Sequence, residues 1–254
     1  MKPKIWGIIN ITPDSFSDGG KYFSLENALR HAQDLIDSGA DVIDIGGEST
    51  RPGANVLGFE EEWSRIKDIL PLIKEIKKDV IISLDTTKGE IIKRAINYID
   101  IINDVSGFSD PIMLDIVKNS GLPAVLIHNL GVPADPSKTI PEGLNVIEEV
   151  SMWFEKKLES LSSSNLILDP GIGFGKTASQ SLEILKNIAE LHKFNLPLLV
   201  GHSRKSYMKL LGIDDKDAAT GVISLYVAQK QVQHIRVHNV ALNKQFLDIY
   251  NTLL

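Results

Sequence analysis

Short apolar runs alternate with longer amphipathic segments along the whole chain. Eight of these runs have the length of strands and are nearly continuous in apolar residues, which is typical of parallel strands covered on both faces. The predicted strands are residues 5–10, 42–45, 80–84, 101–103, 124–127, 166–168, 198–200 and 235–237.

A segment with the 3.6-residue period of an amphipathic helix follows each predicted strand. The predicted helices are residues 25–37, 59–77, 88–97, 112–119, 144–161, 179–192, 218–229 and 240–253. Eight strand–helix units in 254 residues predict an α/β protein, a (β/α)8 TIM barrel formed by residues 1–254 as a single domain. An open, doubly wound sheet is the alternative.

The loops differ in length at the two ends of the predicted strands. The turns that enter strands are short, whereas the segments that leave them are long and polar, such as residues 11–24, 46–58 and 129–143. The loops that leave the strands of a barrel share one face, where active sites are built. We therefore expect the functional site on that face.

Amide and carboxylate side chains stand where several predicted strands end. Each could cap the next helix, but capping does not require them to gather around one barrel mouth. Such a ring of acceptors suits a flat heterocycle rich in N–H donors. Asp44 lies inside a predicted strand, where an unpaired carboxylate is costly, so we expect it to support the ring. The strand-end residues are Asn10, Asp85, Asn103, Asp104 and Asp169.

The sixth predicted strand runs into residues 169–176, which contain three glycines and end in Lys176. A phosphate-binding P-loop needs a glycine where this chain has Pro170, and the dinucleotide fingerprint needs glycines in a different register. Both interpretations fail. An acidic strand end followed by a flexible glycine-rich loop remains.

Basic residues cluster after the last two predicted strands, which favours an anion site there because barrels commonly hold phosphate at this place. They are Arg204, Lys205, Arg236 and His238. Histidines at strand ends could instead indicate a metal-dependent hydrolase, but a His-x-His pair is missing after the first strand. A hard cation with oxygen ligands is more natural, and Asn10 could supply one of them.

Composition narrows the class of protein. The net charge of −6 argues against a nucleic-acid partner, and cysteine is absent, which suits a reducing compartment. No apolar run has the length of a membrane span or of a signal peptide's apolar region. We therefore expect a cytoplasmic protein with no membrane partner.

Two long stretches resemble the signatures of the dihydropteroate synthase family. The members of this family are folate-pathway enzymes built on pterin-binding barrels. They are residues 5–20 and 39–53, and shorter matches follow in order at 85–86, 102–104, 169–176, 203–206 and 236–238. The resemblance implies a transferase that joins p-aminobenzoate to 6-hydroxymethyl-7,8-dihydropterin diphosphate, giving 7,8-dihydropteroate and diphosphate by an SN1-like reaction. It also implies sulfonamides as competitors of p-aminobenzoate, Mg²⁺ as cofactor, and a homodimer.

The same resemblance assigns roles to individual residues of this chain. Asp14, Arg51 and Lys205 would be catalytic, with Asp14 facing the developing cation, and Asn10 would bind the metal. The residues for pterin diphosphate would be Thr50, Asp85, Asn103, Asp169, Lys205, Arg236 and His238. The residues for p-aminobenzoate would be Thr50, Arg51, Pro52, Phe174, Lys205 and Ser206.

The chain departs from the family pattern at two positions. Asn129 follows His128 where the family usually has methionine, and Asn239 follows His238 where it often has aspartate. Two alternatives stay open: a related pterin-binding methyltransferase, which would share the pterin carboxylates, and a pterin binder without activity, which the two departures allow. Turnover with p-aminobenzoate separates all three.

Overall fold

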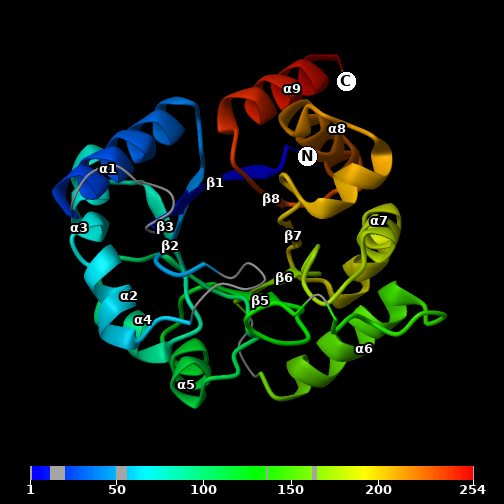
Figure 1. Ribbon diagram of the computed structural model, residues 1–254, viewed down its shortest axis with the longest axis horizontal. Helices are drawn as coiled ribbons and strands as arrows, with labels where there is room; N and C mark the ends of the chain where they lie inside the picture. The colour runs from blue at the N-terminus through cyan, green and yellow to red at the C-terminus, as the bar shows by residue number, and fades with distance from the viewer. Residues whose placement is uncertain (1, 12–20, 50–55, 136, 162–164, 254) are drawn as a thin grey trace.

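The computed structural model describes residues 2–11, 21–49, 56–135, 137–161 and 165–253, and for 21–24 it describes the backbone alone. In these ranges eight parallel strands form the centre of the molecule (Figure 1). They are β1 (Lys4–Asn10), β2 (Val42–Gly46), β3 (Ile81–Asp85), β4 (Ile101–Asp104), β5 (Ala124–Ile127), β6 (Leu166–Asp169), β7 (Leu199–Val200) and β8 (His234–Val237).

The strand order closes the sheet on itself. Neighbouring strands run β6-β5-β4-β3-β2-β1-β8-β7, and a parallel bridge between Leu168 and Leu198 joins the two ends of this order. The TIM barrel predicted from the sequence is thus confirmed, and the open doubly wound sheet is excluded. Each strand begins and ends within two residues of its predicted bounds.

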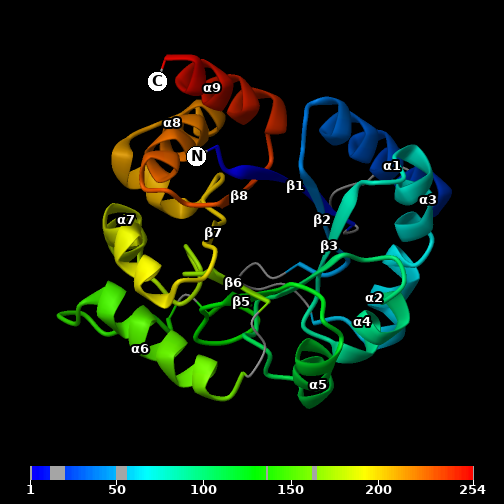
Figure 2. The same ribbon diagram turned by 180° about the vertical axis from the view of Figure 1, so that it is seen from behind.

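Helices surround the barrel on all sides, as both views show (Figures 1 and 2). The α-helices are α1 (Lys21–Asp37), α2 (Phe59–Ile66), α3 (Ile69–Ile76), α4 (Gly89–Ala95), α5 (Pro111–Asn119), α6 (Val146–Glu159), α7 (Ala178–Asn187), α8 (Lys216–Gln229) and α9 (Val240–Leu253). The 3₁₀ helices are η2 (Ile188–Phe194) and η3 (Ser206–Leu211). None of the helices in the described ranges is both long and apolar enough to cross a bilayer.

Two predicted helices are divided in the structure. The predicted helix 59–77 is α2 and α3, separated by Lys67 and Asp68. The cause is Pro71, because proline has no N–H to donate to the carbonyl of Lys67 and its ring clashes with that carbonyl. The predicted helix 179–192 changes from α-helix to 3₁₀ helix at Ile188.

Two apolar layers hold the barrel together. The larger lies between the strands and the helices, and the smaller fills the inside of the barrel. The smaller cluster includes Trp6, Val42, Val125, Ile167 and Leu199, all buried. Side chains on one face of a strand repeat every second residue. The positions that face the inside of the barrel are therefore apolar at the start of the strands and polar near their ends. The polar half of the interior is the candidate site.

Candidate active site

Asp44, Asp85, Asn103 and Arg236 form one hydrogen-bonded network across the polar end of the barrel. Asn103 Nδ2 donates to Asp44 Oδ1 at 3.0 Å, and Arg236 Nε donates to Asp44 Oδ2. Arg236 Nη2 donates to Asp85 Oδ2 at 2.6 Å. Four strands, β2, β3, β4 and β8, contribute these side chains. The expectation that Asp44 supports the ring is confirmed, since it is fully buried and orients both Asn103 and Arg236.

The network leaves two buried acceptors without a partner among the described residues: Asp85 Oδ1 and Asn103 Oδ1. Burial raises the pKa of Asp85 to about 7, although Arg236 acts against this. One guanidinium shared with Asp44 does not compensate both carboxylates. Buried polar groups are nearly always hydrogen-bonded in folded proteins, so unpaired acceptors at a barrel mouth point to a ligand with N–H donors.

Asp169 ends β6 and faces the same interior. Its Oδ1 accepts from the N–H of Gly171 at 2.7 Å, and a side-chain carbon at Gly201 would lie 3.7 Å from its Oδ2. Burial raises the pKa of Asp169, and Lys205 and Arg236 lower it in part. One oxygen of Asp169 therefore shapes the following turn, while the other lies where a small residue leaves space.

The strand-end residue Asp104 has a local role instead. Its carboxylate accepts from the N–H groups of Ser106 at 2.7 Å and Phe108 at 3.0 Å, and so closes its own turn. This is the capping role that each strand-end carboxylate could have had on sequence grounds alone.

Lys176 holds the glycine-rich loop closed from inside. Its Nζ donates to the carbonyl oxygens of Phe174 at 2.8 Å and Gly171 at 3.0 Å, and lies 2.8 Å from His128 Nδ1. Gly171 has φ +67°, and a side-chain carbon there would lie 1.9 Å from the carbonyl oxygen of His128. The loop thus requires glycine, and its lysine binds the loop itself, which agrees with rejecting the P-loop interpretation.

Phe174 and Lys205 meet over the mouth, as expected for two residues of one site. Lys205 Nζ lies 4.1 Å from the centroid of the Phe174 ring, a cation–π geometry. Ser206 is exposed as the first residue of η3. Lys205 also lies close enough to Asp169 to lower its pKa. The structure therefore brings the β6 loop and the β7 loop together at one wall.

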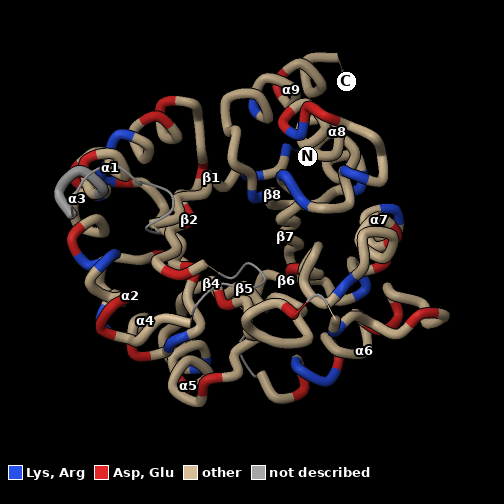
Figure 3. The backbone as a smooth tube through the Cα atoms, in the orientation of Figure 1, with Lys and Arg blue, Asp and Glu red and all other residues tan. Residues whose placement is uncertain are grey.

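Two members of the expected basic cluster, Arg204 and Arg236, already bind carboxylates of the protein. Arg204 is bound through two nitrogens to Asp217, at 2.7 and 2.8 Å, and Arg236 is bound to Asp44 and Asp85. His238 Nδ1 lies 3.0 Å from Ser203 Oγ. Figure 3 shows acidic positions near β2, β4 and β6 and basic positions near β8.

Asn10 ends β1 at the mouth, and its Oδ1 lies 3.7 Å from the place of a side-chain carbon on Gly46. No group of three or more His, Cys, Asp or Glu in the described ranges could hold a metal. Mg²⁺ commonly keeps several waters and takes few protein ligands beside substrate phosphates. The single hard oxygen of Asn10 would fit such a site, with phosphate oxygens of a substrate as further ligands.

Four expected site residues, Asp14, Thr50, Arg51 and Pro52, lie outside the described residues. The base of the second loop is described: Glu48 Oε1 accepts from the N–H of Leu57 at 2.8 Å. Lys88 donates to Glu48 Oε2 and, at 2.6 Å, to the buried Glu62. Sequence reasoning missed Lys88, Glu62 and Asp217, because no strand-end position or spacing marks them.

A cavity of about 560 Å³ adjoins this mouth between the loops that follow β3, β4 and β5. Its wall includes Asp85, Thr86, Asn129 and Trp153. Asn129 Oδ1 accepts from the N–H of Leu130 at 2.8 Å, whereas its Nδ2 is buried without a partner among the described residues. The departure from the family pattern at Asn129 therefore puts a buried donor beside the site that no described residue pairs.

The barrel and this mouth define a pterin-binding type of site, and comparison with known proteins agrees. The family model described as pterin binding enzyme matches residues 6–238. The chain therefore belongs to the pterin-binding enzyme family. It is 41% identical over 249 residues to a dihydropteroate synthase of Escherichia coli (strain K12), covering 94% of this chain and 87% of that one.

Two solved structures extend the comparison. A dihydropteroate synthase from Anaplasma phagocytophilum with bound 6-hydroxymethylpterin-monophosphate has a TM-score of 0.91 and 37% identity, with both chains covered completely. A Xanthomonas albilineans dihydropteroate synthase with 4-aminobenzoic acid has a TM-score of 0.90 and 32% identity, covering 99% of this chain and 93% of that one.

Proposed function

We propose that this chain is a transferase that condenses p-aminobenzoate with 6-hydroxymethyl-7,8-dihydropterin diphosphate to give 7,8-dihydropteroate and diphosphate. The observation that carries the proposal is a pair of buried acceptors, Asp85 Oδ1 and Asn103 Oδ1, which end adjacent strands and have no partner in the described part of the chain. A dihydropterin carries amine and ring N–H donors along one edge, which would satisfy them.

Each substrate has a wall of the mouth. Asp85, Asn103, Asp169 and Lys205 hold the pterin, and Asp44 orients Asn103 and Arg236 from below. p-Aminobenzoate lies by Phe174, Lys205 and Ser206, and sulfonamides compete for the same place. Thr50, Arg51 and Pro52, outside the described residues, are expected to bind it as well. In the reaction the bond from the methylene carbon to the diphosphate oxygen breaks, the p-aminobenzoate nitrogen bonds to that carbon, and the nitrogen loses a proton.

The diphosphate leaves toward the β8 side. His238 and Arg236 bind it there, and Arg236 remains anchored by Asp44 and Asp85. Asn10 would hold Mg²⁺, whose chemistry when bound is neutralisation of the leaving diphosphate. Asp14 on the first loop stabilises positive charge that develops on the methylene carbon. The homodimer implied by the resemblance and the cytoplasmic location expected from the composition remain predictions, which sedimentation and cell fractionation test.

Asp169→Asn tests the site directly. Asparagine keeps an oxygen for the N–H of Gly171, so the turn is expected to fold normally. It also turns an acceptor into a donor that faces the donors of the pterin, which costs about 2–4 kcal/mol, or roughly 30- to 1000-fold in affinity. Calorimetric titration with the pterin diphosphate measures this. Wild-type affinity would make Asp169 a turn residue only.

Turnover separates the proposed activity from the alternatives. The wild-type protein is expected to release diphosphate only when p-aminobenzoate and the pterin diphosphate are both present. A pterin-binding methyltransferase, or a binder without activity, would bind the pterin and release no diphosphate.

A further inference from the structure

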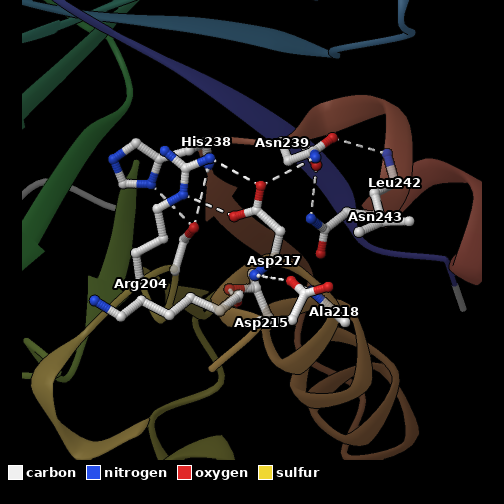
Figure 4. A network of polar contacts seen from close by, with 11 residues as sticks. Arg204, Asp215, Asp217, Ala218, His238, Asn239, Leu242 and Asn243 are labelled. Carbon is white, nitrogen blue, oxygen red and sulfur yellow. Dashed lines mark hydrogen bonds and ion pairs between the residues drawn. The ribbon is translucent and has the colours of Figure 1, made fainter. Parts of the chain in front are cut away.

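Asp217, at the start of α8, connects the ends of β7 and β8 behind the mouth (Figure 4). Arg204 Nε and Nη2 donate to Oδ1 and Oδ2 of its carboxylate, and Asn239 Nδ2 donates to Oδ2 at 3.1 Å from the other side. Arg204 follows β7 and Asn239 follows β8. Asp217 therefore connects the two loops from the side of α8, in addition to the direct contact between Ser203 and His238.

The neighbours of these two residues belong to the site. Arg204 stands between Ser203, which contacts His238 Nδ1, and Lys205, which lies over Phe174. Arg204 has φ +58°, a left-handed conformation that costs a non-glycine residue about 1 kcal/mol and persists only when its surroundings hold it. The two bonds to Asp217 supply that hold. The pKa of Asp217 is lowered to about 2, chiefly by Arg204, so the carboxylate stays ionised.

A second, buried connection joins the same strands. His202 Nε2 lies 2.9 Å from Ser224 Oγ, which donates to Asn243 Oδ1 at 2.6 Å. Asn243 Nδ2 donates to the carbonyl oxygen of Asn239 at 2.7 Å. The backbone of Asn239 is thus fixed by Asn243. The identity of the side chain at position 239 therefore determines which group contacts Asp217.

Asn239 suits the carboxylate of Asp217 because its side chain is neutral and has an N–H group to donate. Its Oδ1 accepts from the N–H of Leu242 and so caps α9, a task that aspartate performs equally well. Its Nδ2 is the group that aspartate lacks. An aspartate at 239 would place two carboxylates about 3 Å apart, where both cannot stay ionised without cost.

We propose that Asp217 is a positioning residue for the transfer reaction, and that Asn239 is its required partner in this chain. The proposal rests on the proposed function: Asp217 acts through Arg204 and Asn239 to hold Lys205 and His238 against the pterin diphosphate. The departure from aspartate at 239 is then an adaptation to the carboxylate at 217 and not a loss of activity.

The test is a double-mutant cycle on the full chain, with calorimetric affinity for the pterin diphosphate and kcat/KM as readouts. Asn239→Asp is expected to lower both about ten-fold, within the range of couplings in one hydrogen-bond network. In the Asp217→Asn background the same change is expected to cost less than about three-fold, because an amide then meets the new carboxylate. Asn239→Ser, which keeps a cap without adding charge, is expected to lie between wild type and Asn239→Asp.

Asn145→Asp is the matched control. Asn145 caps α6 through the N–H of Ile147 and donates to a carboxylate, Glu148 Oε1, at 2.9 Å, but it does not touch the β7 or β8 loops. It is expected to keep wild-type affinity. Full affinity of Asn239→Asp, an equal loss in both backgrounds, or an equal loss in Asn145→Asp would overturn the proposal. Absence of wild-type turnover would overturn the proposed activity, while the affinity cycle would still report on Asp217.

Discussion

At the scale of single residues, Asp85 has the most consequential protonation state. Its pKa of about 7, against an ordinary 3.8, means that the free protein holds a proton there below neutral pH. Ligand N–H donors favour the ionised form. We therefore expect pterin binding at pH 6 to release close to one proton and at pH 9 almost none. Titrations repeated in buffers of different ionisation enthalpy measure this, and equal release at both pH values would contradict it.

The same shift affects the stability of the free protein. Because the folded state binds more protons than the unfolded state between about pH 4 and 7, the contribution of Asp85 to the free energy of unfolding falls as pH rises through that window. Asp85→Asn removes this dependence, so comparing denaturation of the two proteins at pH 5 and pH 8 isolates it.

Asn129 is the second residue that departs from the family pattern, and its buried Nδ2 has no partner in the described part of the chain. An unpaired buried donor costs about 1–3 kcal/mol. Asn129→Met removes it and gives up bonds to the N–H groups of Leu130 and Gly131, which are exposed and can bind water. We expect a gain of about 1 kcal/mol in the free energy of unfolding, measured by urea denaturation. A loss would mean that the Asn129 turn matters more than the buried donor.

At the scale of elements, the loop after β6 depends on Lys176. Lys176→Met keeps the apolar stem but leaves the carbonyl oxygens of Gly171 and Phe174 without their donor. We expect a loss of about 2–3 kcal/mol in the free energy of unfolding. Affinity for p-aminobenzoate should also fall, because Phe174 is no longer fixed. Lys186→Met, at an exposed position in α7, is the control. Unchanged stability of Lys176→Met would show that water replaces the lysine.

The elements themselves were largely predictable, and their interruptions show why the rest was not. Apolar runs gave the strands within two residues, since burial on both faces leaves a direct signal in sequence. The break between α2 and α3 was missed, although Pro71, which forbids the bond to Lys67, marks it in the sequence. The bond between Arg204 and Asp217 was not readable, since it joins a left-handed loop residue to a helix start. Arg204 consequently looked like a free cation in sequence.

At the scale of the molecule, barrel closure turns strand ends far apart in sequence into one site. Asp44 and Arg236 are separated by 192 positions and share a hydrogen bond, because β2 and β8 both pair with β1. A sequence predicts which residues end strands. It does not say which carboxylate receives the guanidinium, because that depends on side-chain geometry inside the closed ring.

The negative charge of the whole molecule opposes the binding of an anionic substrate. The chain has a net charge of −6, and Asp44, Asp85 and Asp169 face Arg236 and Lys205 at the mouth. A diphosphate brings further negative charge to this acidic surface, so a divalent cation should decide its affinity. We expect excess chelator to lower the affinity for the pterin diphosphate at least about ten-fold and to abolish turnover, while the pterin without its diphosphate binds equally with and without Mg²⁺.

Asn10→Ala should reproduce much of the chelator's effect in the presence of Mg²⁺, because Asn10 supplies the hard oxygen at the β1 end. Calorimetric titrations of both ligands, with chelator and with Mg²⁺, measure these differences. Equal affinity for the diphosphate in chelator would mean that Arg236, Lys205 and His238 neutralise it unaided.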